Sequence, residues 1–147
     1  MLNNVSLVNF TDLNKQEKVM VLTWRNNENV KKWMYTTEDI LIDEHLSFID
    51  KLKKQKNKLY FLVKKENENL GVIDFININN NISAEMGIYI NPDLKNLGKL
   101  FMQIIIDYAF LTLKVRTIFS EVFEDNIKAL GLYKKFGFKD FEKKIIN

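Results

Sequence analysis

The sequence predicts an α/β (α+β) fold in which helices flank a mixed, largely antiparallel central sheet. Three observations lead to this prediction. Apolar residues recur at helical spacing in the first third of the chain. From Lys58 to Ile90 they form strand-like runs, which the polar segments Glu66–Asn69 and Asn79–Asn81 interrupt. Helical and strand patterns then alternate from Leu97 onward, which is typical of a crossover between parallel strands.

The first half of the chain is expected to begin with a strand, Val5–Asn9, whose apolar and polar residues alternate. Helices are expected over Asn14–Asn26, Asn29–Met34 and Ile42–Gln55. In the third helix Asp43 is the predicted cap, because a short acidic side chain can accept hydrogen bonds from the free N–H groups of a first turn.

The second half is expected to form an antiparallel meander and then a strand–helix–strand crossover, so that strands four and five are parallel. The expected strands are Lys58–Glu66, Asn69–Ile78, Ile82–Ile90, Arg116–Phe123 and Gly137–Ile146, and the expected helices are Leu97–Leu113 and Asp125–Phe136. Asp125 or Asn126 is expected to open the last helix. These elements fit a single domain over residues 1–147.

Composition limits the classes of function. The chain has no cysteine and one histidine, His45, which argues against a metal site and against cysteine or Ser-His-Asp catalysis. The net charge of +3 comes from lysines spread along the chain, so no nucleic-acid partner is expected. No apolar run approaches the roughly 18 residues of a membrane span. The N-terminal residues lack the features of a signal peptide, and a cytoplasmic protein is expected.

The segment Glu85–Phe110, EMGIYINPDLKNLGKLFMQIIIDYAF, suggests a site for an anionic ligand. A strand ends at Asn91-Pro92, and a loop then leads into a long helix whose start exposes free N–H groups. Gly98 would let the backbone approach a ligand closely, and Lys95 or Lys99 would add positive charge. Two parallel strands that diverge here would leave a slot for an extended, amide-bearing chain. The pantetheine arm of coenzyme A has that chemistry.

Two motifs resemble those of the GCN5-related N-acetyltransferase (GNAT) family. KNLGKL, Lys95–Leu100, resembles the pyrophosphate loop, with Lys95 in place of Gln or Arg and Leu100 in place of a small residue. NIKALGLYKKFGF, Asn126–Phe138, resembles the family's Asn-x-x-Ala-x-x-Leu-Tyr-x-x-x-Gly-Phe segment. The resemblance implies the GNAT-type sheet with splayed parallel strands 4 and 5. It also implies acetyl-CoA as co-substrate, without a metal.

The resemblance also implies which residues meet acetyl-CoA. They are Ile88, Tyr89, Ile90, Lys95, Asn96, Leu97, Gly98, Lys99, Leu100, Asn126 and Tyr133. Backbone N–H groups near Tyr89 and Ile90 would polarise the acetyl carbonyl. Asn126 would either hydrogen-bond the pantetheine arm or cap its own helix.

Within the family, WRNNENVKKWM, Trp24–Met34, resembles the branch that includes ribosomal-protein N-terminal acetyltransferases. Nearly the whole chain resembles enzymes that acetylate the 4-amino group of UDP-4-amino-4,6-dideoxy-N-acetyl-β-L-altrosamine. That reaction is a step toward pseudaminic acid for flagellin glycosylation. An amino sugar nucleotide is therefore the expected partner, and a homodimer is compatible with the sequence. The alternatives are an acetyltransferase for protein N-termini or polyamines, and a non-catalytic acyl-CoA-binding module.

Acetyl transfer needs an acid for the leaving thiolate and a base for the amine. By the resemblance Tyr133 is the acid, and a phenol with a pKa of about 10 can protonate a thiolate whose thiol pKa is about 8.5. Two carboxylates compete as base. Glu121 is expected among aromatic residues on a strand, where burial would raise its pKa, and Glu85 begins the strand before the loop. The alternative for each is an ion pair or an exposed strand end.

The N-terminal helices carry the candidates for binding the acceptor: Arg25, Met34, Tyr35, His45 and Phe48. Aromatic and methionine side chains can flank a uracil or a deoxysugar, and a cation can meet a diphosphate. The alternative is that the apolar residues belong to the core and that His45 is a surface or capping residue.

Overall fold

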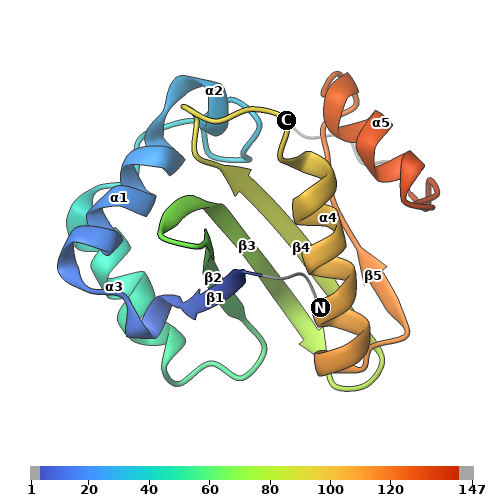
Figure 1. Cartoon of the computed structure of the whole chain (residues 1–147), viewed down its shortest axis with the longest axis horizontal. Helices are drawn as coiled ribbons and strands as arrows, with labels where there is room; N and C mark the ends of the chain where they lie inside the picture. The colour runs from blue at the N-terminus through green and yellow to red at the C-terminus, as the bar shows by residue number, and fades with distance from the viewer. Residues whose placement is uncertain (1–3, 143–147) are drawn as a thin grey trace.

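The computed structural model describes residues 4–142, which form a five-stranded sheet of order β1-β2-β3-β4-β5 (Figure 1). The strands are β1 (Val5–Asn9), β2 (Leu59–Lys65), β3 (Glu68–Asn79), β4 (Ser83–Ile90) and β5 (Thr117–Phe119). All neighbouring strands are antiparallel except β4 and β5, which are parallel. The predicted mixed, largely antiparallel sheet is therefore confirmed.

Helices cover both faces of the sheet (Figure 1). They are α1 (Lys15–Asn26), α2 (Glu28–Lys31), α3 (Ile42–Leu52), α4 (Gly98–Asp107) and α5 (Ile127–Lys135), with a 3-10 turn at Phe10–Asp12 and a π-helix at Tyr108–Leu113. The N-terminal helices α1 and α3 pack on one face, and α4 with its π-helical extension packs on the other. Within residues 4–142, no helix combines the length and apolar character that a membrane crossing requires.

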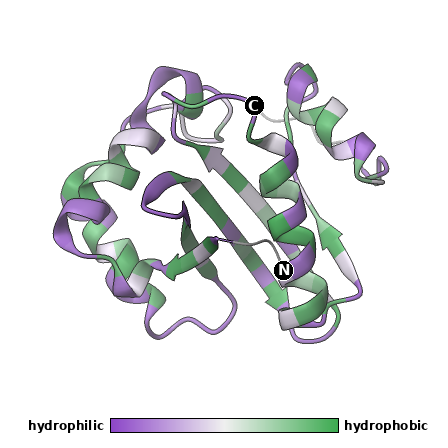
Figure 2. Ribbon diagram, viewed as in Figure 1, coloured by the Kyte–Doolittle hydropathy of each residue, from purple (hydrophilic) through white to green (hydrophobic). Residues whose placement is uncertain are grey.

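Alternation along the strands divides the core into two layers. Leu62 and Val72, both fully buried, point to the layer that contains Trp24 of α1. Their neighbours in sequence point the opposite way, toward Phe101 and the rest of α4. Figure 2 shows hydrophobic residues along the strands and hydrophilic residues in the outer turns. Each fully buried large apolar side chain contributes about 1.5–3 kcal/mol, so both layers stabilise the sheet.

Local capping explains where α1 begins. The Asn14 Oδ1 accepts the N–H of Glu17 at 2.8 Å, and the Glu17 carboxylate accepts the N–H of Asn14 at 3.0 Å. This reciprocal capping box satisfies two backbone donors. Glu17 also pairs with Lys64 of β2 at 2.8 Å, and a hydrogen bond from Lys64 is the largest cause of its lowered pKa. The cap therefore also ties α1 to the sheet.

Three predicted features of the elements are wrong. Asp43 does not cap α3, whose N-cap residue Leu41 makes no side-chain hydrogen bond. The fifth strand ends at Phe119 instead of Phe123, since β4, its partner within the described residues, pairs with it no further. Residues 137–142 form no strand, and the remainder of the predicted strand Gly137–Ile146 lies outside the described residues. Apolar alternation shows strand character, but it does not show whether a partner lies within hydrogen-bonding reach.

Candidate active site

The parallel strands β4 and β5 pair over three residues and then diverge. Their pairing runs from Ser83–Thr117 to Glu85–Phe119. β4 continues to Ile90 with β3 as its only strand partner among the described residues. The backbone groups of residues 86–90 that point away from β3 therefore have no strand to pair with. An extended, amide-bearing ligand can form hydrogen bonds along this edge. We call this opening the fork.

The loop after β4 bends sharply into α4. The Asn91 carboxamide oxygen accepts the N–H of Asp93 at 3.0 Å, and its Nδ2 donates to the Asn69 carbonyl at 3.3 Å. Asn96 has a φ of 64°, in the left-handed region that asparagine tolerates better than most residues. These local interactions place the beginning of α4 directly after the edge of β4.

The first turn of α4 offers backbone donors. Leu97, its N-cap residue, contributes no side-chain hydrogen bond, and the first bond of the helix runs from the Phe101 N–H to the Leu97 carbonyl at 3.0 Å. Among residues 4–142, the N–H groups of residues 98–100 therefore have no acceptor. Lys95 and Lys99 are exposed beside them. The positive end of the helix dipole and these donors suit a phosphate group.

Gly98 lies where α5 packs against α4. A Cβ atom at this position would come within 2.9 Å of the Leu132 Cδ2. The absence of a side chain therefore lets α5 pack close to the start of α4, which the sequence did not predict. The expected role of Gly98 beside a ligand stays a prediction.

Tyr133 on α5 lies beside the end of β5. Its ring packs against Phe138 at 5.7 Å, and its side chain hydrogen-bonds Ser120, the residue after β5. Burial raises the pKa of Tyr133, the hydrogen bond from Ser120 lowers it, and the charge of Asp74 raises it, with a net increase. The phenol therefore stays protonated at neutral pH, as a general acid must.

Asn126 caps α5 through an Oδ1 that accepts the Ala129 N–H at 3.3 Å.

The two predicted carboxylates differ in their environment. Glu85 is partly buried at the last paired position of β4 and accepts a hydrogen bond from the Asn77 Nδ2 at 3.3 Å. Glu121 is exposed beyond β5 and accepts a hydrogen bond from the Tyr35 hydroxyl. The expectation that Glu121 is buried among aromatic residues is therefore wrong. A role as base stays a prediction for both.

Arg25 is buried in α1, with 9% of its surface exposed. Its Nη2 donates to the Thr36 carbonyl at 2.7 Å, whereas its Nη1 is buried and has no partner among the described residues. Burial lowers the pKa of Arg25, and an interaction with Tyr89 of β4 raises it.

The Tyr35 ring meets Phe123 edge-on at 5.6 Å between ring centroids. The segment after α2, which includes the partly buried Met34, thus lies beside the segment after β5.

The two predicted acceptor residues of α3 are held by other contacts. His45 is buried, not at the surface, and its Nε2 donates to the Lys18 carbonyl of α1 at 2.8 Å. Burial is the largest cause of its lowered pKa, so the ring is neutral near pH 7 and its Nδ1 is an acceptor. The Phe48 ring meets Tyr60 edge-on at 5.0 Å. Whether either residue contacts an acceptor stays a prediction.

The structure adds one carboxylate that sequence reasoning missed. Asp74 of β3 lies in register between Tyr60 of β2 and Gly87 of β4, and it retains some contact with solvent. Burial, and then the charge of Glu85, raise the pKa of Asp74 to about 7. The available signal was an aspartate inside an otherwise apolar strand segment, GVIDFI. Such perturbed carboxylates are typical of functional sites.

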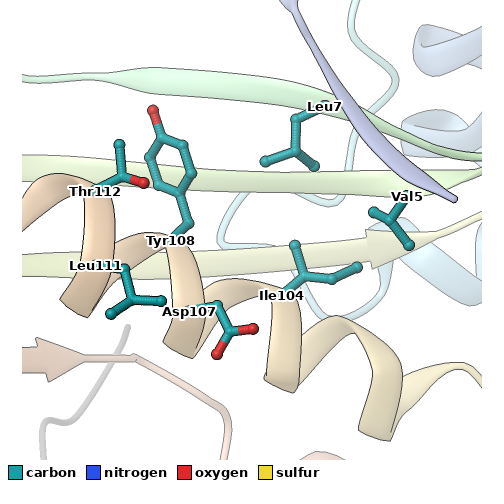
Figure 3. A pocket seen from close by; sticks show the side chains of 7 residues that line it. All are labelled: Val5, Leu7, Ile104, Asp107, Tyr108, Leu111 and Thr112. Atoms are coloured by element: carbon teal, nitrogen blue, oxygen red, sulfur yellow. The ribbon is translucent and has the colours of Figure 1, made fainter. Parts of the chain in front are cut away.

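A separate cavity lies away from the fork. It has a volume of about 100 Å³ and lies between β1 and α4 with its π-helix, lined by Val5, Leu7, Ile104, Asp107, Tyr108, Leu111 and Thr112 (Figure 3). β1 is at the opposite edge of the sheet from β5, so this cavity is not part of the candidate active site.

Within residues 4–142, no three His, Asp or Glu side chains are grouped to hold a metal ion.

A family model described as an acetyltransferase (GNAT) domain matches residues 8–139. The chain belongs to this family. The match includes β2 to β5 and the helices α1 to α5, and therefore every part of the fork. GNAT membership also agrees with the observed sheet, in which β4 and β5 are parallel and separate.

Similar GNAT proteins differ in how closely they match this chain. Acetyltransferase PseH from Campylobacter jejuni strain 81-176 is 44% identical over 138 residues, which cover 94% of this chain and 87% of the relative. A crystal structure of C. jejuni N-acetyltransferase PseH in complex with acetyl coenzyme A superimposes with a TM-score of 0.81 and 39% identity, covering 95% of this chain and 92% of that chain. Escherichia coli K12 spermidine N(1)-acetyltransferase is 27% identical over 116 residues, 77% of this chain and 62% of the relative.

Proposed function

We propose that this GNAT protein transfers acetyl from acetyl-CoA to the 4-amino group of UDP-4-amino-4,6-dideoxy-N-acetyl-β-L-altrosamine, a step toward pseudaminic acid and flagellin glycosylation. The amine attacks directly while both substrates are bound. The observation that carries the proposal is the 44% identity to acetyltransferase PseH across 94% of the chain. This likeness extends over the fork and over the N-terminal helices that are expected to meet the acceptor. The solved PseH complex holds acetyl coenzyme A.

The fork has the chemistry to hold acetyl-CoA, which supplies the activated acetyl group. The open edge of β4 suits the amides of the pantetheine arm. The free N–H groups at the start of α4, with Lys95 and Lys99 beside them, suit the pyrophosphate. Both sets of donors come from the backbone, so they are in place before the ligand binds. Such preorganisation favours catalysis because little is reordered during the reaction.

Tyr133 is the proposed acid. Burial raises its pKa, which keeps the proton on the phenol until a thiolate leaves. Its hydrogen bond with Ser120 holds the side chain beside the end of β5, the strand that diverges from β4. The role needs contact with the sulfur of the co-substrate, which the position of Tyr133 at the fork supports.

The acceptor is proposed to bind on the α1 and α3 side of the sheet. An unpaired buried donor such as the Arg25 Nη1 is costly, and a diphosphate oxygen would satisfy it. Tyr35, Met34 and Phe48 would flank the uracil or the deoxysugar of the acceptor. The Nδ1 of the neutral His45 ring would accept a hydrogen bond from the acceptor. A buried arginine beside the acceptor disfavours a polyamine, because two cations repel each other. The lower identity to the spermidine enzyme agrees with this preference.

Mass spectrometry of the reaction products tests the proposal. The full chain is incubated with acetyl-CoA and the UDP-4-amino sugar, and in parallel with spermidine and with an N-terminal peptide. We expect a single added acetyl group on the sugar nucleotide, with release of free thiol. Acetylation of spermidine or of the peptide in its place would contradict the acceptor. Binding of acetyl-CoA without thiol release from any amine would support a non-catalytic module.

A further inference from the structure

We propose that Asp74 is a catalytic residue that binds the ammonium form of the acceptor amine and takes its proton. The inference rests on the proposed function and deepens it, because it identifies the base that the reaction needs. It also replaces Glu85 and Glu121 in that role.

The carboxylate of Asp74 lies across β4 at the opening of the fork. A Cβ atom on Gly87 would come within 2.5 Å of the Asp74 Oδ2 and 2.8 Å of its Oδ1. The carboxylate therefore occupies the space that a side chain at position 87 would fill. Gly87 is two residues beyond Glu85, where pairing with β5 ends. A glycine in the middle of a strand weakens it, so this one has a packing reason: it lets Asp74 reach toward the fork.

The groups around Asp74 are acidic or phenolic. Tyr60 of β2, Glu85 and Tyr89 of β4, and Tyr133 of α5 all interact with it electrostatically. Within residues 4–142, Asp74 has no ion pair and no hydrogen bond. A partly buried carboxylate that is surrounded by acidic and phenolic groups and has no partner lowers the stability of the folded protein. The chemistry that would complete this cluster is a cation with N–H donors, which an ammonium group supplies.

Asp74 and Tyr133 come from a strand and a helix on different sides of the fork. Tyr133 extends from α5 on the β5 side, and Asp74 reaches over β4 from β3, yet the charge of Asp74 influences the Tyr133 phenol. A base and an acid are thus placed on the two sides of one opening. Burial and the neighbouring Glu85 raise the pKa of Asp74 to about 7, a useful value for a base at neutral pH.

The proton balance of the reaction closes with these two residues. An N–H bond of the ammonium breaks and an O–H bond forms on Asp74. The freed nitrogen lone pair forms the N–C bond while the C–S bond breaks, and the sulfur takes the Tyr133 proton. The second nitrogen proton returns to the Tyr133 phenolate, and Asp74 releases its proton to solvent. One proton is released in total, as acetylation of an ammonium requires.

The other two carboxylates are less suited to this role. Glu121 is exposed and receives the Tyr35 hydroxyl hydrogen bond. Glu85 accepts a hydrogen bond from the Asn77 Nδ2 and lies where β4 and β5 are still paired. Its negative charge instead acts on Asp74, whose pKa it raises. Glu85 is therefore a positioning residue in this scheme, since it adjusts the affinity of Asp74 for a proton.

The pH dependence of kcat/KM for the amine, with acetyl-CoA saturating, separates these roles. The ionisation of the acceptor is common to all variants, so differences belong to the protein. We expect Asp74→Asn to lower the rate about 10²–10⁴-fold and to remove the acidic limb contributed by the enzyme. Glu85→Gln should keep that limb but shift it to lower pH, because the charge that raises the pKa of Asp74 is lost. Asp50→Asn, an exposed carboxylate on α3, is the control and should match the wild type.

Binding of acetyl-CoA, measured by calorimetry, is the second readout and should be unchanged in Asp74→Asn. Loss of binding, or a wild-type limb in Asp74→Asn, would overturn the role of Asp74. Loss of the limb in Glu85→Gln would assign the base to Glu85 instead. If the wild type acetylates a different amine, the proposed acceptor fails, and the same profiles with that amine decide the role of Asp74. If no amine is acetylated, both proposals fail.

Discussion

At the scale of single residues, Tyr133 gives the most direct test of the proposed acid. Tyr133→Phe removes only the hydroxyl and keeps the ring contact with Phe138. We expect turnover to fall about 10²–10⁴-fold while acetyl-CoA affinity changes little, because the phenol acts on the leaving thiolate. Steady-state kinetics and calorimetry measure the two effects. Tyr108→Phe, which lines the separate cavity between β1 and α4, is the control. An unchanged kcat would remove Tyr133 from the chemistry.

The residues of the candidate site differ in how far sequence could predict them. Tyr133 and Asn126 belong to a motif with fixed spacing, so the family resemblance singled out both residues. Asp74 belongs to no motif, and its importance depends on Gly87, a residue of the next strand. Glu121 was wrongly placed among buried aromatic residues because strand alternation continues through residues that have no strand partner. Local patterns therefore predict which side a residue faces better than they predict which groups surround it.

At the scale of elements, the fork depends on different lengths of strand pairing. β4 is paired with β3 along nearly its whole length and with β5 over three residues. The sequence predicted that β4 and β5 are parallel, because a helix of sufficient length connects them. It did not predict how short β5 is. After α4 and its π-helix, the chain pairs with β4 over three residues and then diverges from it. Helix starts were predictable where asparagine forms the cap, as at Asn14 and Asn126, and not at α3.

The start of α5 allows the two expected roles of Asn126 to be separated. Its Oδ1 accepts the Ala129 N–H, which makes it a cap, and its Nδ2 remains for a ligand. Asn126→Ser can cap but lacks the amide donor. We expect it to keep stability and acetyl-CoA affinity, whereas Asn126→Ala should lose about 1 kcal/mol of stability. Chemical denaturation and calorimetry measure these effects. If Asn126→Ser binds acetyl-CoA much more weakly, the amide contacts the ligand as well.

At the scale of the whole molecule, the two faces of the sheet serve different purposes. The α4 face is apolar from β1 to β5, and its residues form the larger buried cluster. The α1 and α3 face combines a smaller apolar cluster with the polar residues Asp74, Glu85 and Tyr89 near the fork. Burying a carboxylate without a partner lowers stability, and the apolar face must offset this cost. A site that costs stability in the free protein is expected where a substrate supplies the missing partner.

The burial of the Asp74 carboxylate predicts how the stability of the protein depends on pH. The pKa of Asp74 is raised in the folded state to about 7, so its stabilising contribution is complete below about pH 4 and is lost as the pH rises through about 7. Asp74→Asn should therefore be more stable than the wild type at pH 8, by up to about 4 kcal/mol at about 1.36 kcal/mol per pKa unit, and similar to it near pH 4.

Chemical denaturation of both proteins across this pH range measures the difference. Glu17 and His45, whose pKa values are lowered, oppose the trend in both proteins, so only the difference between the curves is informative. A variant that gains stability while losing activity would show that Asp74 is retained for chemistry and not for folding. If Asp74→Asn is instead less stable at pH 8, the carboxylate makes stabilising interactions in solution, and the cost assigned to its burial is wrong.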